Sequence, residues 1–202
     1  MASLEDVTRG LGIFASMLMG AGLIAVRLRT SFRPSALPSS VSLWLLVDGI
    51  IRLYDGLFGV LRPASLRWWI FKPYLIYCQA DFTYCDLKNP WMWTESYMDL
   101  WEITLGTTAL WLASQEGKVN AQASRLLALV CTVMTCHKTC MYLLMEPMSD
   151  YASTGHNDFL NFWFIWFVPN AIWVVAPAYC IYELFQVLLE HGHSTSAKGK
   201  GA

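Results

Sequence analysis

The chain has 202 residues, of which 55% are hydrophobic and only 14% are charged, and its mean hydropathy is +0.39. This composition is unusual for a soluble domain of that length and indicates a membrane protein. The net charge of -1 offers no basic surface to nucleic acid, which is therefore excluded as a partner.

Five apolar stretches are long enough to cross a bilayer as helices, which takes about 20 residues. They run approximately over Leu11–Val26, Val41–Leu61, Tyr97–Ser114, Leu126–Met145 and Phe159–Leu189. The first should remain in the mature protein because Arg27 and Arg29 follow its apolar run, whereas a signal peptide carries its positive charge before the run. We predict an all-α fold, a polytopic membrane protein in which residues 1–190 form a bundle of five transmembrane helices and residues 191–202 form a disordered tail.

The positive residues that flank these stretches indicate the orientation of the chain. The side reached after the first, third and fifth helices is the more basic and is expected to be cytosolic, together with the C-terminus. Its basic residues are Arg27, Arg29, Arg33, Lys118, Arg125, Lys198 and Lys200. On the opposite, lumenal side, the segment from Arg62 to Glu95 is too polar to span and too aromatic for a plain linker, so we expect it to fold over one mouth of the bundle. Cys78 and Cys85 lie in this segment and could form a disulfide there, although their spacing alone does not establish the geometry.

Charged residues interrupt the apolar stretches. A charge at the bilayer centre costs about 2.5 to 3.5 kcal/mol, so it normally faces the interior of a bundle or a wet pocket. In the second stretch Asp48, Arg52 and Asp55 share one helix face, and Arg52 can pair with either carboxylate. Asp99 and Glu102 share a face in the third. One interpretation is that these groups only join helices to one another.

A second interpretation is chemical. Asp99 and Glu102 cannot both ionise cheaply in a low-dielectric site, so one of them is expected to hold a proton that it can donate. Trp166, Asn170 and Trp173 share a face of the last stretch, where indole rings could stabilise a cation. An acid, a cation stabiliser and a second proton acceptor can together move a double bond or rearrange a carbon skeleton through a carbocation. Neither Cys-x-x-Cys nor His-Glu-x-x-His occurs in the sequence, and we expect no metal or other cofactor.

The run Asn161–Pro177, NFWFIWFVPNAIWVVAP, resembles the last-helix signature of the emopamil-binding protein family, also called the EXPERA domain. The segment Tyr142–Glu146, YLLME, resembles the end of that family's fourth helix. The Glu95-to-Glu102 spacing resembles an acidic pair leading into its third helix, and Asp55-Gly56 resembles the Glu-Gly of its second. Together these matches extend roughly from Val41 to Glu183.

The resemblance implies a five-helix protein of the endoplasmic reticulum membrane with an intramembrane cavity. The best-known member of the family is the sterol Δ8-Δ7 isomerase, which protonates a sterol alkene and removes a different proton. Carried over to this chain, the resemblance implies catalytic roles for Glu102, Asp55, Asn170 and Trp173. Further residues that we expect to bind substrate are Asp99, Trp166, His137, Tyr142, Arg52 and Asp48. The family isomerase has a His one turn before its second-helix acid, whereas Ile51 stands there in this chain.

Three functions remain open from the sequence. The first is an isomerase or cyclase that acts by proton transfer on a sterol-like or terpenoid substrate. The second is the sterol isomerase itself, with Asp55, His137 or Glu102 in the role of the missing His. The third is a non-enzymatic protein that binds or traffics sterols or lipids. The missing His favours the first over the second, and the retained Glu102, Asn170 and Trp173 favour catalysis over binding. The expected partners are an apolar small molecule, membrane lipid and a second copy of the chain in a homodimer.

Overall fold

The computed structural model describes residues 4–86 and 88–198. Every helix or strand element within these residues is a helix, which confirms the expected all-α class. The long helices are α1 (Leu4–Phe32), α2 (Ser39–Val60), α4 (Pro90–Ser114), α5 (Lys118–Met148) and α6 (Val168–Lys198), the last preceded by the π-helix η4 (Asn161–Phe167). The short elements are η1 (Ala64–Arg67), η2 (Trp69–Phe71), α3 (Lys72–Tyr77) and η3 (Phe82–Tyr84).

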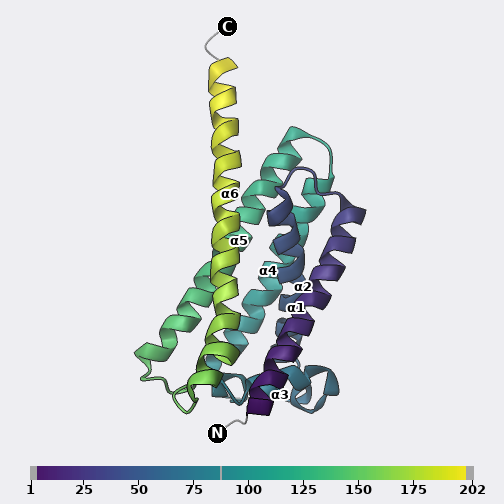
Figure 1. Ribbon diagram of the computed structural model, residues 1–202. Helices are drawn as coiled ribbons and strands as arrows, with labels where there is room; N and C mark the ends of the chain where they lie inside the picture. Colours follow the sequence, from purple (N-terminus) through teal and green to yellow (C-terminus); the bar gives the residue numbers. More distant parts are fainter. Residues whose placement is uncertain (1–3, 87, 199–202) are drawn as a thin grey trace.

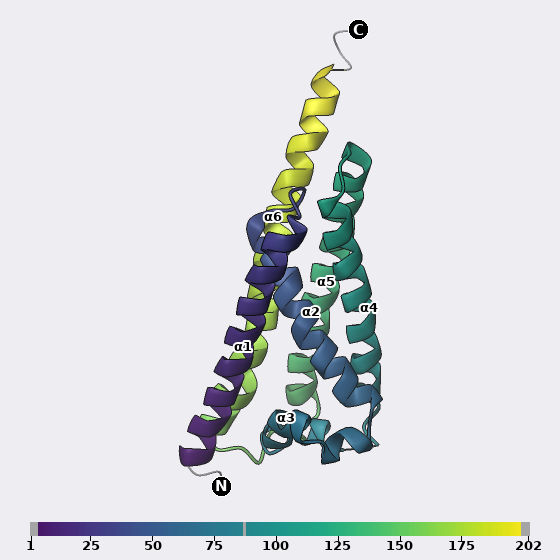
Figure 2. The same cartoon turned by 90° about the vertical axis from the view of Figure 1, so that its right-hand side faces the viewer.

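The long helices run side by side, and the short elements between α2 and α4 lie across one end of the bundle (Figures 1 and 2). This is where the sequence places the segment from Arg62 to Glu95, except that α4 already begins at Pro90. The start of α1 and the end of α6 lie at opposite ends of the molecule (Figure 1).

The end of α6 projects beyond the other helices in both views (Figures 1 and 2). This helix continues to Lys198, so it covers most of the stretch 191–202 that we expected to be a disordered tail. Residues 199–202 of that predicted tail lie outside the described residues.

Local sequence signals explain where α4 and α5 begin. Asn89 caps α4, because its side-chain oxygen accepts a hydrogen bond of 2.9 Å from the backbone N–H of Trp91, and Pro90 supplies a first helical residue that needs no hydrogen-bond acceptor. Gly117 precedes α5 with φ of 116°, a conformation that residues with a side chain rarely adopt. The tight link between α4 and α5 therefore depends on this glycine.

Two glycines allow α2 and α4 to approach closely. A Cβ atom added at Gly59 would lie 1.6 Å from Ser96 Oγ and 2.6 Å from Ser96 Cβ, and one added at Gly56 would lie 3.4 Å from Asp99 Cβ. Small residues at helix crossings are typical of membrane bundles, where close backbone packing replaces the hydrophobic effect as a driving force. This crossing brings the charged faces of α2 and α4 together.

Two helical segments, Lys118–Met148 and Asn161–Glu190, are long and apolar enough to cross a membrane by length and composition. The apolar runs of α2 and α4 are each interrupted by three charged residues, which lowers their hydropathy. These residues are Asp48, Arg52 and Asp55 in α2, and Glu95, Asp99 and Glu102 in α4.

Candidate functional site

Six charged side chains from three helices form one buried group, which we call the charge cluster. Its members are Asp48, Arg52 and Asp55 of α2, Asp99 and Glu102 of α4, and Lys138 of α5. All except Asp55 are at most 5% exposed. The cluster lies where the glycine-mediated crossing of α2 and α4 meets the middle of α5.

Arg52 is the hub of the charge cluster. Its Nε lies 3.3 Å from Asp48 Oδ1 and 3.3 Å from Glu102 Oε2. Its Nη1 lies 3.4 Å from Asp99 Oδ1 and 3.7 Å from Asp55 Oδ2. The guanidinium therefore pairs with both carboxylates of its own helix face, as the spacing predicts, and also with two carboxylates of α4.

Lys138 is the second cation of the charge cluster. Its Nζ donates hydrogen bonds to Asp99 Oδ1 and, over 3.1 Å, to Glu102 Oε2. The acidic pair of α4 is thus bound by cations from two other helices. If every member ionised, four carboxylates would face two cations, and this negative excess in a low-dielectric interior would favour uptake of a further positive charge or of protons.

Next to the charge cluster lies a cavity of about 130 Å³. Its walls come from α1, α2, α3, η3, α4, α5, η4 and α6 and are mostly apolar and aromatic. The lining residues are Ile13, Met17, Ile51, Arg52, Tyr54, Asp55, Pro73, Tyr74, Tyr77, Tyr84, Glu95, Thr139, Tyr142, Phe164, Ile165, Pro169, Asn170 and Trp173. A small number of polar groups in an otherwise apolar enclosure is typical of a small-molecule site.

Two carboxylates, Asp55 and Glu95, line the cavity. Asp55 lies beside Arg52, and its Oδ1 is buried without a hydrogen-bond partner. Glu95 is 8% exposed, and its Oε2 atom is buried. Its side chain makes neither an ion pair nor a hydrogen bond with any described residue. Buried carboxylate oxygens are normally paired, so these two groups are candidates for contact with a ligand or with a transferred proton.

A hydrogen-bond chain, which we call the Asp81 chain, reaches the cavity through Tyr77, Tyr142 and Asn170. The Tyr142 hydroxyl donates to Asp81 Oδ2 and accepts from Trp166 Nε1 at 2.9 Å. The hydroxyls of Tyr77 and Tyr142 are 3.4 Å apart, and Asn170 Nδ2 donates to the Tyr77 oxygen at 2.7 Å. Burial, reinforced by the negative charge of Asp81, raises the pKa of Tyr77, so its phenol is neutral and can donate.

The π-helix η4 explains how the last helix delivers its residues to the cavity. π-segments are rare and frequently occur at functional sites. Here Pro169 has no N–H to offer the preceding turn, and the Asn170 side chain donates to the Trp166 carbonyl oxygen at 2.6 Å. The wider turn places Phe164 and Ile165 on the cavity wall together with Asn170.

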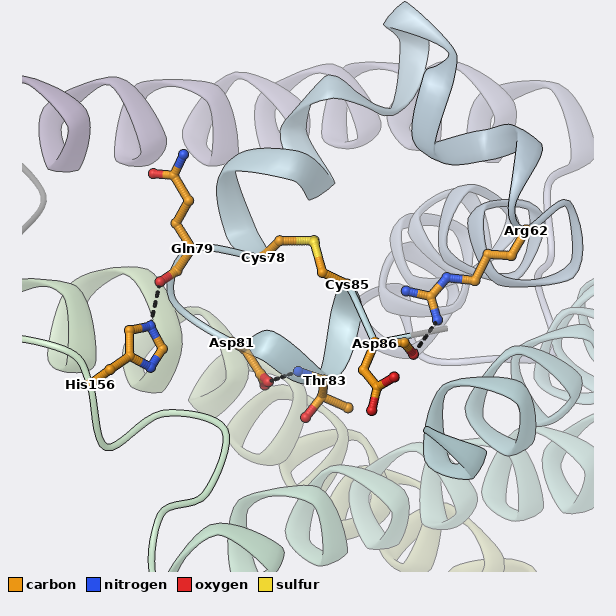
Figure 3. The surroundings of a disulfide bond; sticks show 8 residues. All are labelled: Arg62, Cys78, Gln79, Asp81, Thr83, Cys85, Asp86 and His156. Carbon is orange, nitrogen blue, oxygen red and sulfur yellow. Dashed lines mark hydrogen bonds between the residues drawn. A yellow bond between two sulfur atoms is a disulfide. The ribbon is translucent and has the colours of Figure 1, made fainter. Parts of the chain in front are cut away.

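The loop that carries Asp81 is closed by a disulfide between Cys78 and Cys85, the pairing that the sequence allowed (Figure 3). Asp81 accepts a hydrogen bond of 2.8 Å from the backbone N–H of Thr83 within this loop. His156 lies in the connection between α5 and η4, and its Nε2 is 2.6 Å from the carbonyl oxygen of Gln79, within hydrogen-bond distance (Figure 3). The loop is therefore held both by its covalent link and by a neighbouring segment.

The structure separates the residues expected at the site into two groups. Arg52, Asp55, Tyr142, Asn170 and Trp173 line the cavity. The residues that do not line it are Asp48, Asp99, Glu102, His137 and Trp166.

Each residue of the second group has a different environment. Asp48, Asp99 and Glu102 are buried in the charge cluster, and Trp166 is buried in the Asp81 chain. His137 is exposed on the outer face of α5, one position away from the buried Lys138. Helix geometry explains the difference, because neighbouring residues of a helix point about 100° apart.

Sequence reasoning assigned no role to Lys138, Tyr77 or Asp81. Lys138 carries a signal of its own, since a lysine inside an apolar stretch must find a partner. Asp81 and Tyr77 belong to the segment between α2 and α4, where the sequence offers no periodic pattern that would point them at the bundle. No family model, curated protein or solved structure matches the chain.

Proposed function

We propose that this protein is a five-span membrane isomerase or cyclase of the endoplasmic reticulum, acting by proton transfer on a sterol-like or terpenoid substrate. The observation that carries the proposal is the cavity lined by two carboxylates, Asp55 and Glu95, and by aromatic rings. A proton donor, a proton acceptor and π faces are the groups that chemistry through a carbocation requires.

Five spans are proposed because α1, α2 and α4 run alongside α5 and the η4–α6 helix (Figure 2). These two are the helices whose length and hydropathy are by themselves sufficient to cross a membrane. The charged residues of α2 and α4 are turned inward into the charge cluster, so the outer faces that would meet lipid are apolar. Exposed apolar residues of α2 and α4 include Leu53, Leu57, Leu100, Trp101 and Trp111. An odd number of spans also fits the opposite positions of the two chain ends.

The environments of the two cavity carboxylates suggest separate roles. A carboxyl group that acts as an acid must arrive protonated, and Glu95 has no described cation as an ion-pair partner. Asp55 is 3.7 Å from the Arg52 guanidinium, and Glu95 has no such neighbour among the described residues, so we assign proton acceptance to Asp55 on this difference in position. In the proposed reaction Glu95 protonates a carbon–carbon double bond to form a carbocation, and Asp55 removes a different proton to form the new double bond. Proton return from Asp55 to Glu95, directly or through water, completes the cycle.

In this proposal Glu102, for which we expected a catalytic role, does not transfer a proton. Glu102 is bound to Lys138 and Arg52 and does not line the cavity. Its proposed role is to hold Arg52 in place beside Asp55. Trp173 keeps its proposed position beside the cation, since it lines the cavity, and its indole N–H donates to Asp48 Oδ1 at 2.8 Å.

A binding function is the second candidate, and the negative excess of the charge cluster favours it. A lipid or sterol derivative with an ammonium group could sit between Asp55, Glu95 and the aromatic walls without any reaction. Turnover would then be absent although the ligand is held.

The test is expression in a yeast strain that lacks its sterol isomerase, followed by profiling of its sterols and terpenoids. We expect the wild-type protein to produce a new product or to restore growth, and Glu95→Gln and Asp55→Asn to abolish that product at unchanged expression. Glu116→Gln, which changes an exposed acid in the link between α4 and α5, is the matched control and should behave as the wild type. A wild-type protein that forms no product but retains a ligand would replace the enzyme proposal with the binding proposal.

A further inference from the structure

Asp81 has no place in the proposed proton transfer, yet it is fully buried behind the cavity-lining residue Tyr142, whose hydroxyl donates to it. It accepts from three donors, which are the Tyr142 hydroxyl, the Trp166 indole N–H at 3.2 Å and the backbone N–H of Thr83. No described cation pairs with it. A buried carboxylate satisfied by neutral donors is costly to keep, so its retention calls for a role beyond holding a loop.

An ionised carboxylate accepts hydrogen bonds and cannot donate them, so it determines the direction of every bond attached to it. Because Tyr142 gives its only proton to Asp81, its oxygen must accept from Trp166 and from Tyr77. The Tyr77 proton is then committed to Tyr142, and the Tyr77 oxygen accepts from Asn170 Nδ2. Four side chains are thereby ordered in one direction, from Asn170 towards Asp81.

Asn170 is the residue at the far end of the Asp81 chain, and it lines the cavity. Its amide nitrogen donates to the Tyr77 oxygen at 2.7 Å and to the Trp166 carbonyl at 2.6 Å. Both amide hydrogens are therefore committed, and no donor among the described residues forms a hydrogen bond to the amide oxygen. Asn170 lines the cavity, so its remaining polar atom is a pure acceptor available to a ligand.

We infer that Asp81 is a positioning residue that acts through Tyr142 and Tyr77 to present the Asn170 amide oxygen as a hydrogen-bond acceptor, and that this acceptor selects substrates carrying a hydroxyl group. The inference rests on the proposed function, because it concerns the substrate of the same cavity. Without Asp81, the chain of hydroxyls could reverse, and the Tyr77 hydroxyl would then direct its proton at the Asn170 amide nitrogen. The bond to the Trp166 carbonyl would alone hold the amide, and the acceptor would be less firmly presented to the ligand.

The test measures the preference for a hydroxyl directly. The purified protein is titrated with two fluorescent sterols that differ only at one oxygen, dehydroergosterol and its 3-methyl ether. We expect the wild-type protein to bind the free alcohol about fivefold to tenfold more tightly, the effect of one net hydrogen bond. In Asp81→Asn the ratio should fall towards one, because an amide at this position can donate to Tyr142. Asp86→Asn, which changes an exposed acid of the same loop, should leave the ratio unchanged.

A second variant and a ligand-free measurement protect the test against misfolding. Tyr142→Phe breaks the chain one step nearer the cavity and should lower the same ratio, even if Asp81→Asn fails to fold. The indole N–H resonance of Trp166, recognised by its loss in Trp166→Phe, should move in Asp81→Asn. A folded Asp81→Asn or Tyr142→Phe protein that retains the full preference, or a wild-type protein without one, would overturn the inference.

The outcomes separate this inference from the proposed reaction. An Asp81-dependent preference for the alcohol, together with an absence of any new yeast product, would leave the inference standing and remove the enzymatic proposal. A new yeast product, together with an alcohol preference that does not depend on Asp81, would support the enzymatic proposal and remove the inference about Asp81.

Discussion

The ammonium group of Lys138 on α5 lies 3.1 Å from Glu102 Oε2 on α4. The same oxygen is 3.3 Å from Arg52 Nε on α2, so one carboxylate joins three helices. Glu102 is 1% exposed and faces the charge cluster instead of the cavity. Glu102, for which the sequence predicted a catalytic role, is thus held between two cations, and the cavity meets Glu95, about two turns earlier on the same face of α4.

Replacing Lys138 should destabilise the protein strongly. Lys138→Met leaves Asp99 and Glu102 buried with Arg52 as their remaining cation, and removing one member of a buried pair costs about 3 to 5 kcal/mol. Thermal unfolding in detergent should show a large fall in the melting temperature. His137→Ala, at the adjacent exposed position, should change stability by no more than about 0.5 kcal/mol. Equal effects of the two substitutions would contradict the arrangement of the charge cluster.

The crossing of α2 and α4 predicts opposite effects for two glycines of one helix. Gly59→Ala should destabilise, because the new Cβ would overlap both Oγ and Cβ of Ser96 and rotation of the serine cannot relieve both contacts. Gly49→Ala meets no atom within 4 Å and should stabilise by about 0.5 to 1 kcal/mol through helix propensity. The unfolding temperatures of the two variants test the crossing, and a stable Gly59→Ala protein would refute it.

Two substitutions of Trp173 should distinguish the contribution of its aromatic ring from that of its indole N–H. Trp173→Phe retains an aromatic face at the cavity but loses the 2.8 Å hydrogen bond to Asp48, a bond to a charged group worth about 1.5 to 3 kcal/mol. We expect reduced stability with partial turnover in the yeast lipid assay. Trp173→Ala should lose more turnover, because the π face is gone as well. Equal turnover in the two variants would show that the ring contributes nothing to the reaction.

Opening the disulfide between Cys78 and Cys85 should destabilise the protein and weaken its ligand site together. In the chain-entropy treatment, closing a loop of about eight residues stabilises by about 2 to 3 kcal/mol, so Cys78→Ser with Cys85→Ser should lower the unfolding temperature. The double variant should also reduce the preference for the sterol alcohol, since Asp81 lies within the opened loop. A reductant added to the wild type should lower its unfolding temperature in the same way. The same reductant should leave the unfolding temperature of the double variant unchanged, because that variant has no Cys78–Cys85 disulfide to reduce. An unchanged alcohol preference would show that Asp81 is held in place without the disulfide.

The sequence by itself determined the helical class and the approximate course of the long helices. Apolar stretches of helical length, and charges that had to face inward, are local properties that periodicity reveals. The pairing of Arg52 with Asp48 and Asp55 followed from the same arithmetic, because all three lie on one helix.

Only the tertiary structure decided which carboxylates face the cavity. Glu95, Asp99 and Glu102 share one face of α4, and the sequence contains nothing that ranks them. Their roles depend on where Lys138 of α5 and Arg52 of α2 reach that face, which is a matter of helix crossing and rotation. Asp81 and Tyr77 were beyond sequence reasoning for a related reason, since the short helices and turns between α2 and α4 carry no sustained period. Their contacts with α5, η4 and α6 join residues more than 60 positions apart.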